Sequence, residues 1–337
     1  HLQGKMAAKT GENTQYGGYL PFILDVTDAV HCDGEYNVVT VLTDNSDNET
    51  VPPGKPQSQL DFTYFGGIYR NVWLEVTDPV HITDPVFEDM VAGGGILVEY
   101  PQVSKESATV SVKTHVRNEG DAQQEVTLRT ELADADGKIV QTRSDSYTLD
   151  GEGDHTFAQE LTVSNPNLWN LDRPYLYKLI STVLVDGKAL DCQETKIGIR
   201  KITMNKDTGL LINGEHTGFL SGVNRHQEYP YVGYAASSNM QRRDAIKFKE
   251  AGFNIVRTSH TVQSMDFIEA CDELGILVME CVPGWQHWSN DPLFGQRVKN
   301  DIRQMVRRTR NHPSILCYEI SLNESPGVPA NFTNDCN

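Results

Sequence analysis

The sequence predicts a multi-domain chain of β and α/β class, and three observations support this. The chain has 337 residues, enough for about two or three domains. Short β-branched segments of alternating polarity occupy it up to about residue 200. After about residue 208, helices alternate with short apolar strands, which indicates a parallel sheet. We therefore expect three domains, at residues 1–78, 79–200 and 201–337.

The first two predicted domains consist of strands. Period-two alternation predicts strands at 37–42, 108–116, 125–132 and 177–185. Turn clusters rich in Asp, Asn and Gly separate these segments. This part of the sequence has no amphipathic helix pattern, so short strands between turns predict sandwich architecture.

The last predicted domain alternates strands with helices. The predicted strands cover 216–223, 254–257, 276–282 and 314–320. The predicted helices cover 239–252, 265–274 and 293–310. Ser264 is the expected N-cap of the second helix, and Gly275 ends it. Successive βα units imply a parallel sheet, either doubly wound or closed into a barrel.

Charge and composition exclude several classes of protein. Lys and Arg number 29 against 46 Asp and Glu, so the formal net charge of −17 argues against a nucleic-acid partner. No apolar run reaches the roughly 18 to 20 residues that a membrane helix needs, so we expect a soluble protein without a membrane partner. The six cysteines form no CxxC pair, which argues against a zinc ribbon. The compartment (periplasmic, secreted or cytoplasmic) and assembly into a homo-oligomer stay open.

Polar and aromatic residues follow each predicted strand of the last domain. They include His226, His260, Trp285, Trp288, Asn323 and Glu324. Because the carboxyl ends of parallel strands share one edge, these residues predict a single site there. A lone His is more often a capping or core residue, and each Trp is as readily a packing residue as a platform for a sugar ring. Glu324 follows a buried strand, where a crowded apolar setting would let its carboxyl hold a proton and act as a general acid.

Seven motifs in order resemble glycoside hydrolase family 2, the family of β-galactosidases, β-glucuronidases and β-mannosidases. The motifs lie at 16–27, 61–72, 169–177, 222–226, 252–260, 271–278 and 311–324. The resemblance covers nearly the whole chain. It implies a partial jelly-roll sugar-binding domain, an immunoglobulin-like β-sandwich and the first half of a (β/α)₈ TIM barrel. It also implies hydrolysis of β-glycosides with retention.

The resemblance assigns roles to several of these side chains. Glu324 becomes the catalytic acid/base, and Asn323 contacts the substrate 2-hydroxyl. His226 and His260 line the subsite for the non-reducing sugar, and Arg257 supports the catalytic carboxylates. We also expect Trp285 to bind substrate, as well as Asp44, or its neighbour Asn45, from a loop of the first domain.

Two departures from the family pattern matter. Cys281 stands where some members place a magnesium ligand, and a soft thiol suits a hard cation poorly, so we expect no metal and no cofactor. The segment 319–322 reads Glu-Ile-Ser-Leu where Trp-Ser-Leu-Gly is more familiar, and it makes the motif one residue longer. This indicates a divergent subgroup.

The chain also stops after the fourth strand, whereas the family's nucleophile follows the seventh. We therefore expect an internal fragment that is inert alone. For the whole enzyme we expect a retaining exo-β-glycosidase, β-galactosidase-like, that acts on terminal β-linked sugars of oligo- or polysaccharides. A β-glucuronidase is the alternative within the class. A non-catalytic carbohydrate-binding protein is the alternative outside it, but joint retention of Asn323, Glu324, His226 and His260 argues against that.

Overall fold

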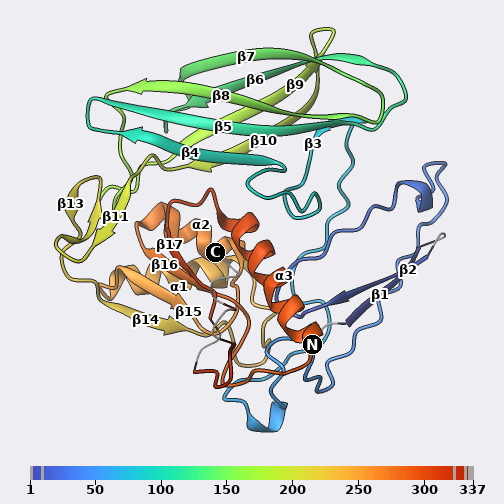
Figure 1. The fold of residues 1–337 in the computed structure, drawn as a ribbon, viewed down its shortest axis with the longest axis vertical. Coiled ribbons are helices and arrows are strands. Elements are labelled where there is room, and N and C mark those ends of the chain that lie inside the picture. Colours follow the sequence, from blue (N-terminus) through green and yellow to red (C-terminus); the bar gives the residue numbers. More distant parts are fainter. Residues whose placement is uncertain (1–2, 9–10, 322–323, 330–331, 333–337) are drawn as a thin grey trace.

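The computed structural model describes residues 3–8, 11–321, 324–329 and 332, with side chains from residue 15 onward. Antiparallel strands β3–β10 form one body, at the top of Figure 1. The helices and four parallel strands form a second body beneath it (Figure 1). A hairpin and long loops from the start of the chain lie beside the second body (Figure 1). The boundaries expected near residues 78 and 200 stay a prediction.

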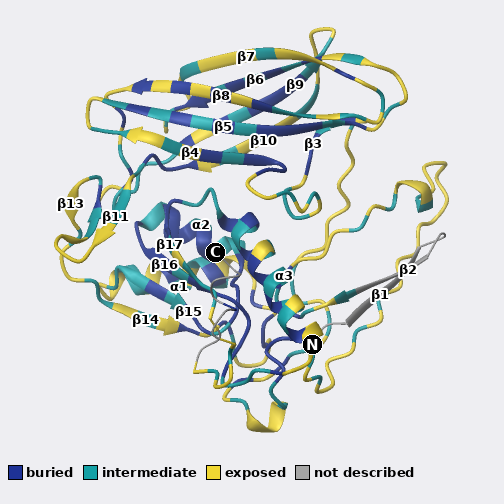
Figure 2. Ribbon diagram, in the orientation of Figure 1, coloured by how far each residue is buried: buried dark blue, intermediate teal, exposed yellow. Residues whose placement is uncertain are grey.

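The upper body is a sandwich of two antiparallel sheets. One sheet has the order β10-β9-β6-β7, and the other has the order β3-β5-β4 with β8 paired to β5. Their bounds are β3 Val80–Ile82, β4 Ile96–Val103, β5 Ser107–Asn118, β6 Gln124–Ala133, β7 Ile139–Leu149, β8 Asp154–Ser164, β9 Tyr177–Val185 and β10 Lys188–Ile197. In β8, buried residues alternate with exposed ones, so one face packs on the core (Figure 2). The strands predicted at 108–116, 125–132 and 177–185 are confirmed.

The start of the chain has little regular structure. Strands β1 Gln3–Ala8 and β2 Gly11–Tyr16 form a hairpin, and the 3₁₀ turns Thr27–Ala29 and Gln57–Gln59 interrupt the loops after it. The strand predicted at 37–42 is wrong, because only Leu42 forms a bridge there. Val38 and Val39 are 85% and 69% exposed. An alternating segment becomes a strand only where successive residues pair with a partner edge, and in this segment the described pairing is limited to Leu42.

The lower body is built on a parallel sheet of order β14-β15-β16-β17. Its strands are β14 Gly222–Arg225, β15 Ile255–Thr258, β16 Leu277–Cys281 and β17 Ile315–Glu319, connected through α1 Ser238–Glu250, α2 Met265–Leu274 and α3 Pro292–Thr309. A small antiparallel sheet of β11 Ile202–Asn205, β12 Gly209–Ile212 and β13 Glu215–His216 precedes it. The predicted helices and the strands at 254–257, 276–282 and 314–320 are confirmed within one or two residues at most ends. The strand predicted at 216–223 is wrong in its bounds, because residues 217–221 form no strand and β14 begins at Gly222.

Local sequence explains where the helices begin and end. Ser264 and Asp291 occupy the N-cap positions of α2 and α3, and the Asp291 side chain accepts a hydrogen bond from the Leu293 N–H at 2.8 Å. Gly275 ends α2 in the left-handed region, at φ 67°. A Cβ at Gly275 would lie 2.4 Å from the carbonyl oxygen of Leu171, so the sandwich side of the chain also requires glycine there.

The loops at the start of the chain pack against the carboxyl edge of the parallel sheet. The Arg70 guanidinium donates to the carbonyl of Tyr234 and, at 2.6 Å, to Gln227 Oε1. The rings of Phe65 and Tyr234 meet edge to face with centroids 4.8 Å apart. These contacts bring residues far apart in sequence to the edge where parallel sheets carry their sites. None of the helices within the described residues is both long and apolar enough to cross a membrane.

Candidate active site

Four predicted side chains lie at the carboxyl edge of the sheet. His226 follows β14, His260 follows β15, Trp285 follows β16 and Glu324 follows β17. The rings of His226 and His260 are 5.5 Å apart and nearly perpendicular. The rings of His260 and Trp285 are 6.4 Å apart and nearly parallel. The structure therefore joins the first three strand ends into one aromatic surface.

The first domain contributes a residue at the centre of this surface. Phe62 is only 6% exposed, and its ring lies 6.2 to 6.3 Å from the rings of His226, His260 and Trp285. Phe62 thus buries apolar area from two predicted domains together, which holds the loop against the sheet edge. Trp285 is itself only 8% exposed, so it forms a wall of the site and leaves little ring face open to a sugar.

A hydrogen-bonded relay connects the first domain to Glu324. Lys55 Nζ lies 4.0 Å from the Trp285 ring centre and donates to Gln286 Oε1 at 2.9 Å. Gln286 Nε2 then donates to Glu324 Oε2, also at 2.9 Å. Because a lysine can only donate, it fixes the amide so that its oxygen faces Lys55 and its NH₂ faces Glu324. The relay therefore orients the Glu324 carboxyl from outside its own strand.

A second carboxylate, Glu319, lies at the end of β17. Its oxygens accept hydrogen bonds from Arg257 Nη2 at 2.5 Å and Arg257 Nε at 2.6 Å. The Cys281 thiol donates to Glu319 Oε2 at 2.9 Å. The three residues come from β15, β16 and β17, so this cluster ties three adjacent strand ends together. A bidentate arginine–carboxylate pair is among the strongest side-chain contacts.

Electrostatics fixes the charge states in this cluster. Burial alone would raise the pKa of Glu319, but hydrogen bonds from Arg257 and Cys281, with the Arg257 charge, outweigh burial and lower that pKa. Burial lowers the pKa of His260 to about 4, and the charges of Arg257 and His226 act in the same direction. Near neutral pH, Glu319 is therefore a carboxylate and His260 a neutral imidazole.

Cys281 does not fit a hard cation. Burial, followed by its hydrogen bond to Glu319, raises the pKa of the Cys281 thiol, so it stays protonated near neutral pH. Its proton is held by Glu319, and Mg²⁺ prefers oxygen ligands. Across the part of the chain that the structure describes, no three His, Cys, Asp or Glu side chains are grouped to hold a metal ion.

The other residues predicted to lie in the site are not placed there by described contacts. Asn323 lies outside the described residues. Asp44 is exposed and accepts from the backbone N–H of Ser46 at 2.9 Å, and no described contact connects it to the sheet edge. Its neighbour Asn45 donates to the carbonyl of Tyr64 at 3.2 Å and so lies nearer to the packed loop. Trp288 packs between Phe294 and Phe332, which makes it a core residue.

The crowded, apolar setting expected around Glu324 is not observed, because this residue is exposed. Glu280 in β16 has the most buried setting on these strands, with 0% exposure and a pKa that burial raises. Glu319 is a half-buried carboxylate in an ion pair, and it was considered in the sequence only as part of the 319–322 segment. A charge inside an otherwise apolar strand is a usable signal, since a buried charge needs a partner. Lys55 and Phe62 were missed, because only the folded chain brings them to the sheet edge. Gln286 lies beside Trp285 in the segment after β16, so its place at the edge could be read from the sequence, but no role was assigned to it.

Comparisons with known proteins agree with this architecture. The family described as "Glycosyl hydrolases family 2" matches residues 96–200. Its "TIM barrel domain" matches residues 203–334, which cover the parallel sheet and its helices. The predicted fold class is confirmed for the immunoglobulin-like sandwich and the first half of a barrel, whose four described strands form an open sheet. The partial jelly roll expected before them stays a prediction, since the regular elements described up to residue 78 are the β1–β2 hairpin and two 3₁₀ turns.

Curated relatives include both sugar specificities. A β-galactosidase of Thermoanaerobacter pseudethanolicus is 35% identical over 96% of this chain and 42% of its own length. A β-glucuronidase of Formosa agariphila is 30% identical over 90% of this chain and 31% of its own length. The crystal structure of a family 2 member from Bacteroides cellulosilyticus superposes with a TM-score of 0.82 at 27% identity, covering 99% of this chain and 43% of that one.

The chain spans 42% and 45% of the lengths of two curated β-galactosidases that it matches. The two family matches nevertheless cover most of its own residues in the expected order. On this evidence the chain belongs to glycoside hydrolase family 2.

Proposed function

We propose that the chain carries the acid/base half of a retaining exo-β-glycosidase that hydrolyses terminal β-linked sugars of oligo- or polysaccharides. The observation that supports this most directly is the convergence at one sheet edge. Glu324 lies there with His260 and Trp285, and Lys55 and Phe62 reach the same edge from the first domain. A carbohydrate is the partner that suits the hydrogen-bonding groups of this edge, with the buried aromatic rings as its walls.

In the proposed mechanism Glu324 protonates the departing glycosidic oxygen and later removes a proton from the attacking water. A retaining enzyme needs a second carboxylate about 5 to 5.5 Å from the first, acting as nucleophile. Glu319 is not assigned that role, because Arg257 and Cys281 already hold both of its oxygens.

The other predicted residues act on the sugar. We assign contact with the 2-hydroxyl to Asn323 and the non-reducing subsite to His226 and His260. As a neutral imidazole, His260 can both donate to and accept from sugar hydroxyls. The Arg257–Glu319 pair supports the floor of the site, and Trp285 forms its wall.

For the sugar itself we propose a β-galactoside. The relative at 35% identity carries that name, whereas the β-glucuronidase from Formosa agariphila matches at 30%. A β-glucuronide is the second candidate, and Lys55 favours it, because a cation close to the site could pair with a sugar carboxylate.

The test is a panel of chromogenic β-glycosides with an active enzyme that contains this chain. We expect release of the chromophore from the β-galactoside and retention of configuration in the product. Turnover of the β-glucuronide alone, lost in Lys55→Met, would select the second candidate. No turnover of any β-glycoside would overturn the proposal.

A further inference from the structure

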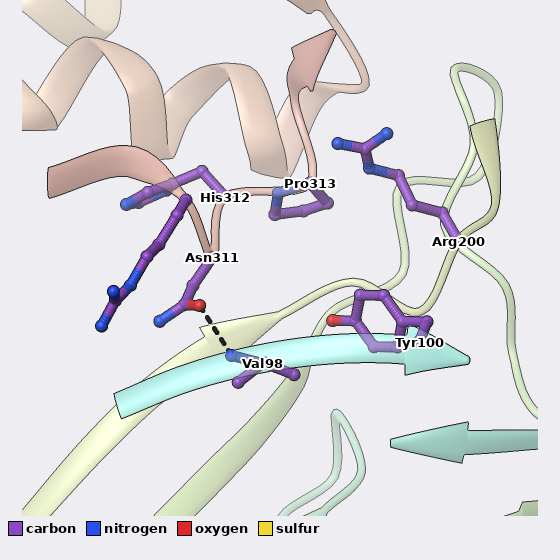
Figure 3. A pocket seen from close by; sticks show the side chains of 7 residues that line it. Val98, Tyr100, Arg200, Asn311, His312 and Pro313 are labelled. Atoms are coloured by element: carbon purple, nitrogen blue, oxygen red, sulfur yellow. Dashed lines mark hydrogen bonds between the residues drawn. The ribbon is translucent and has the colours of Figure 1, made fainter. Parts of the chain in front are cut away.

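A pocket of about 210 Å³ lies where the sandwich meets the amino end of the parallel sheet. Val98 and Tyr100 line it from β4, Arg200 from the segment after β10, and Arg310, Asn311 and His312 from the connection between α3 and β17. Figure 3 shows Tyr100 and Arg200 on one side of this pocket, with Asn311 and His312 on the other. The pocket therefore spans two bodies of the fold, away from the candidate active site.

Contacts across the pocket are directed and specific. Asn311 Oδ1 accepts from the Val98 N–H at 3.0 Å (Figure 3). Its Nδ2 donates to the Ile96 carbonyl at 2.8 Å. Arg310 donates to the carbonyl of Gly93 at 2.8 Å, and Arg200 to the carbonyl of Ile315 at 2.6 Å. These bonds make the pocket a built junction whose walls are held by both bodies.

The pocket is rich in positive charge. Within the described residues no carboxylate forms an ion pair with Arg200 or Arg310. His312 adds a third cation, but its Nδ1 is paired with Asp272 Oδ2 at 2.5 Å, so these two charges cancel. Asp84 is a further carboxylate that acts on Arg310 from a distance, and Arg307 opposes it. Two guanidinium charges therefore remain in a protein whose formal net charge is −17.

Two buried donors in this pocket lack a partner. Among the described residues, neither the Tyr100 hydroxyl nor Arg310 Nε has a hydrogen bond, although both atoms are buried. Burial also lowers the pKa of both arginines, because it removes the guanidinium groups from water, and the charge of Asp272 only partly opposes this at Arg200. A buried donor without an acceptor destabilises the fold, because it has lost its hydrogen bond to water. An acceptor placed in the pocket would remove that destabilisation.

We propose that this pocket binds a small oxyanion such as inorganic phosphate. Guanidinium groups bind oxyanions through their N–H groups. Arg310 Nη1 and Nη2 already donate to the carbonyls of Gly93, Gly94 and Ile96, and Arg200 Nη2 donates to that of Ile315. The first two donors for the ion are therefore Arg310 Nε and the remaining N–H groups of Arg200, and the Tyr100 hydroxyl is the third. A volume of about 210 Å³ holds several waters, at about 30 Å³ each, or one such ion with remaining waters. The bound ion would join the sandwich to the parallel sheet, and this role is independent of the proposed glycosidase activity.

Phosphate titrations of the purified protein test the proposal, with sodium chloride at equal ionic strength as reference. We expect saturable binding by calorimetry and a Tm that rises with phosphate beyond the chloride reference. Arg200→Met should weaken binding by about tenfold or more, because it removes a charge-assisted contact. The matched control is Arg143→Met, which removes the same charge from an exposed sandwich residue and should bind like the wild type.

Tyr100→Phe gives a sharper test that does not depend on Arg200→Met folding. In chloride the variant should match or exceed the wild-type Tm, because it removes an unpartnered buried hydroxyl. In phosphate the order should reverse, because only the wild type keeps the third donor. A wild-type Tm that rises no further in phosphate than in chloride would overturn the proposal. Equal phosphate binding by the wild type and both pocket variants would overturn it as well.

Discussion

Arginines at the two ends of the parallel strands differ in whether a carboxylate pairs with them. At the carboxyl end, Arg257 has both arms on Glu319, and the pair is only 21% exposed on each side. At the amino end, Arg200 and Arg310 donate to backbone carbonyls, and no described carboxylate pairs with them. The arginine charge is neutralised by a carboxylate at the end where we propose that a neutral sugar binds. It is not neutralised by an ion pair at the end where the two bodies meet.

The largest predicted effect is a loss of activity on substitution of Glu324, at the carboxyl end of the strands. In an active enzyme that contains this chain, Glu324→Gln should lower kcat/KM by about 100-fold or more for substrates with poor leaving groups. Activated aryl glycosides should lose much less, because their leaving group needs no proton. The measurement is a leaving-group series on the variant and the wild type. Equal losses along the series would remove Glu324 from the acid/base role.

Breaking the ion pair at the same end should destabilise the fold. Glu319→Gln leaves the Arg257 charge half-buried with a weaker partner, and should cost about 2 kcal/mol in the free energy of unfolding. The control is Asp145→Asn, which breaks the more exposed pair with Arg143 and should cost about 0–1 kcal/mol. Urea unfolding of both variants checks this. Equal costs would show that the buried pair is no stronger than the exposed one.

The Arg257–Glu319 pair also predicts how the free energy of unfolding depends on pH. The folded-state pKa of Glu319 is lowered, so its contribution to stability is present above the unfolded-state pKa of about 4.3. The contribution is lost as the pH falls through the lower, folded-state value. The stability gap between the wild type and Glu319→Gln should therefore narrow below about pH 4. A gap that stays constant down to pH 2 would contradict the lowered pKa.

A smaller effect is expected from the first domain. Lys55→Met should lower kcat on poorly activated substrates by about tenfold, because the Gln286 amide loses the donor that orients it. Lys55→Arg should recover part of the rate. Gln286→Glu is the matched variant: it can still accept from Lys55 but cannot donate to Glu324. Wild-type kcat in both Lys55→Met and Gln286→Glu would show that the relay does not act on Glu324.

No effect is expected from removing divalent metal. Dialysis against a chelator should leave the activity of the enzyme unchanged, because a protonated Cys281 stands where a hard oxygen ligand would be needed. Activity that disappears with the chelator and returns with magnesium would mean that other side chains hold a catalytic cation.

Sequence reasoning worked best where local pattern decides structure. The sandwich strands β5, β6 and β9 and the helices α1–α3 were predicted because alternation, caps and Gly275 act over a few residues, whereas the other sandwich strands were not predicted. The strand at 37–42 failed because pairing depends on a partner edge that the pattern of the segment does not contain. A short-range sequence pattern therefore predicts which segments can form helices or strands. Whether a strand forms also depends on a partner strand elsewhere in the chain.

The candidate site was predicted only in part, for the same reason. His226, His260, Trp285 and Glu324 follow successive strands, so their shared edge can be read from the order of elements alone. The Lys55 and Phe62 contacts join residues more than 150 positions apart in sequence. The partners of Lys55 and Phe62 depend on how one body packs on another, which cannot be predicted from local sequence periodicity.

The relay from Lys55 through Gln286 also has a consequence for engineering. Modular glycosidases invite the exchange of whole domains, with each treated as a separate building block. Here the building blocks share one functional part, because the loop that carries Lys55 and Phe62 completes the edge on which Glu324 lies. A chimera with a foreign first domain would need to keep the loop that carries Lys55 and Phe62. Without that loop, the Gln286 amide that donates to Glu324 would no longer be held by Lys55.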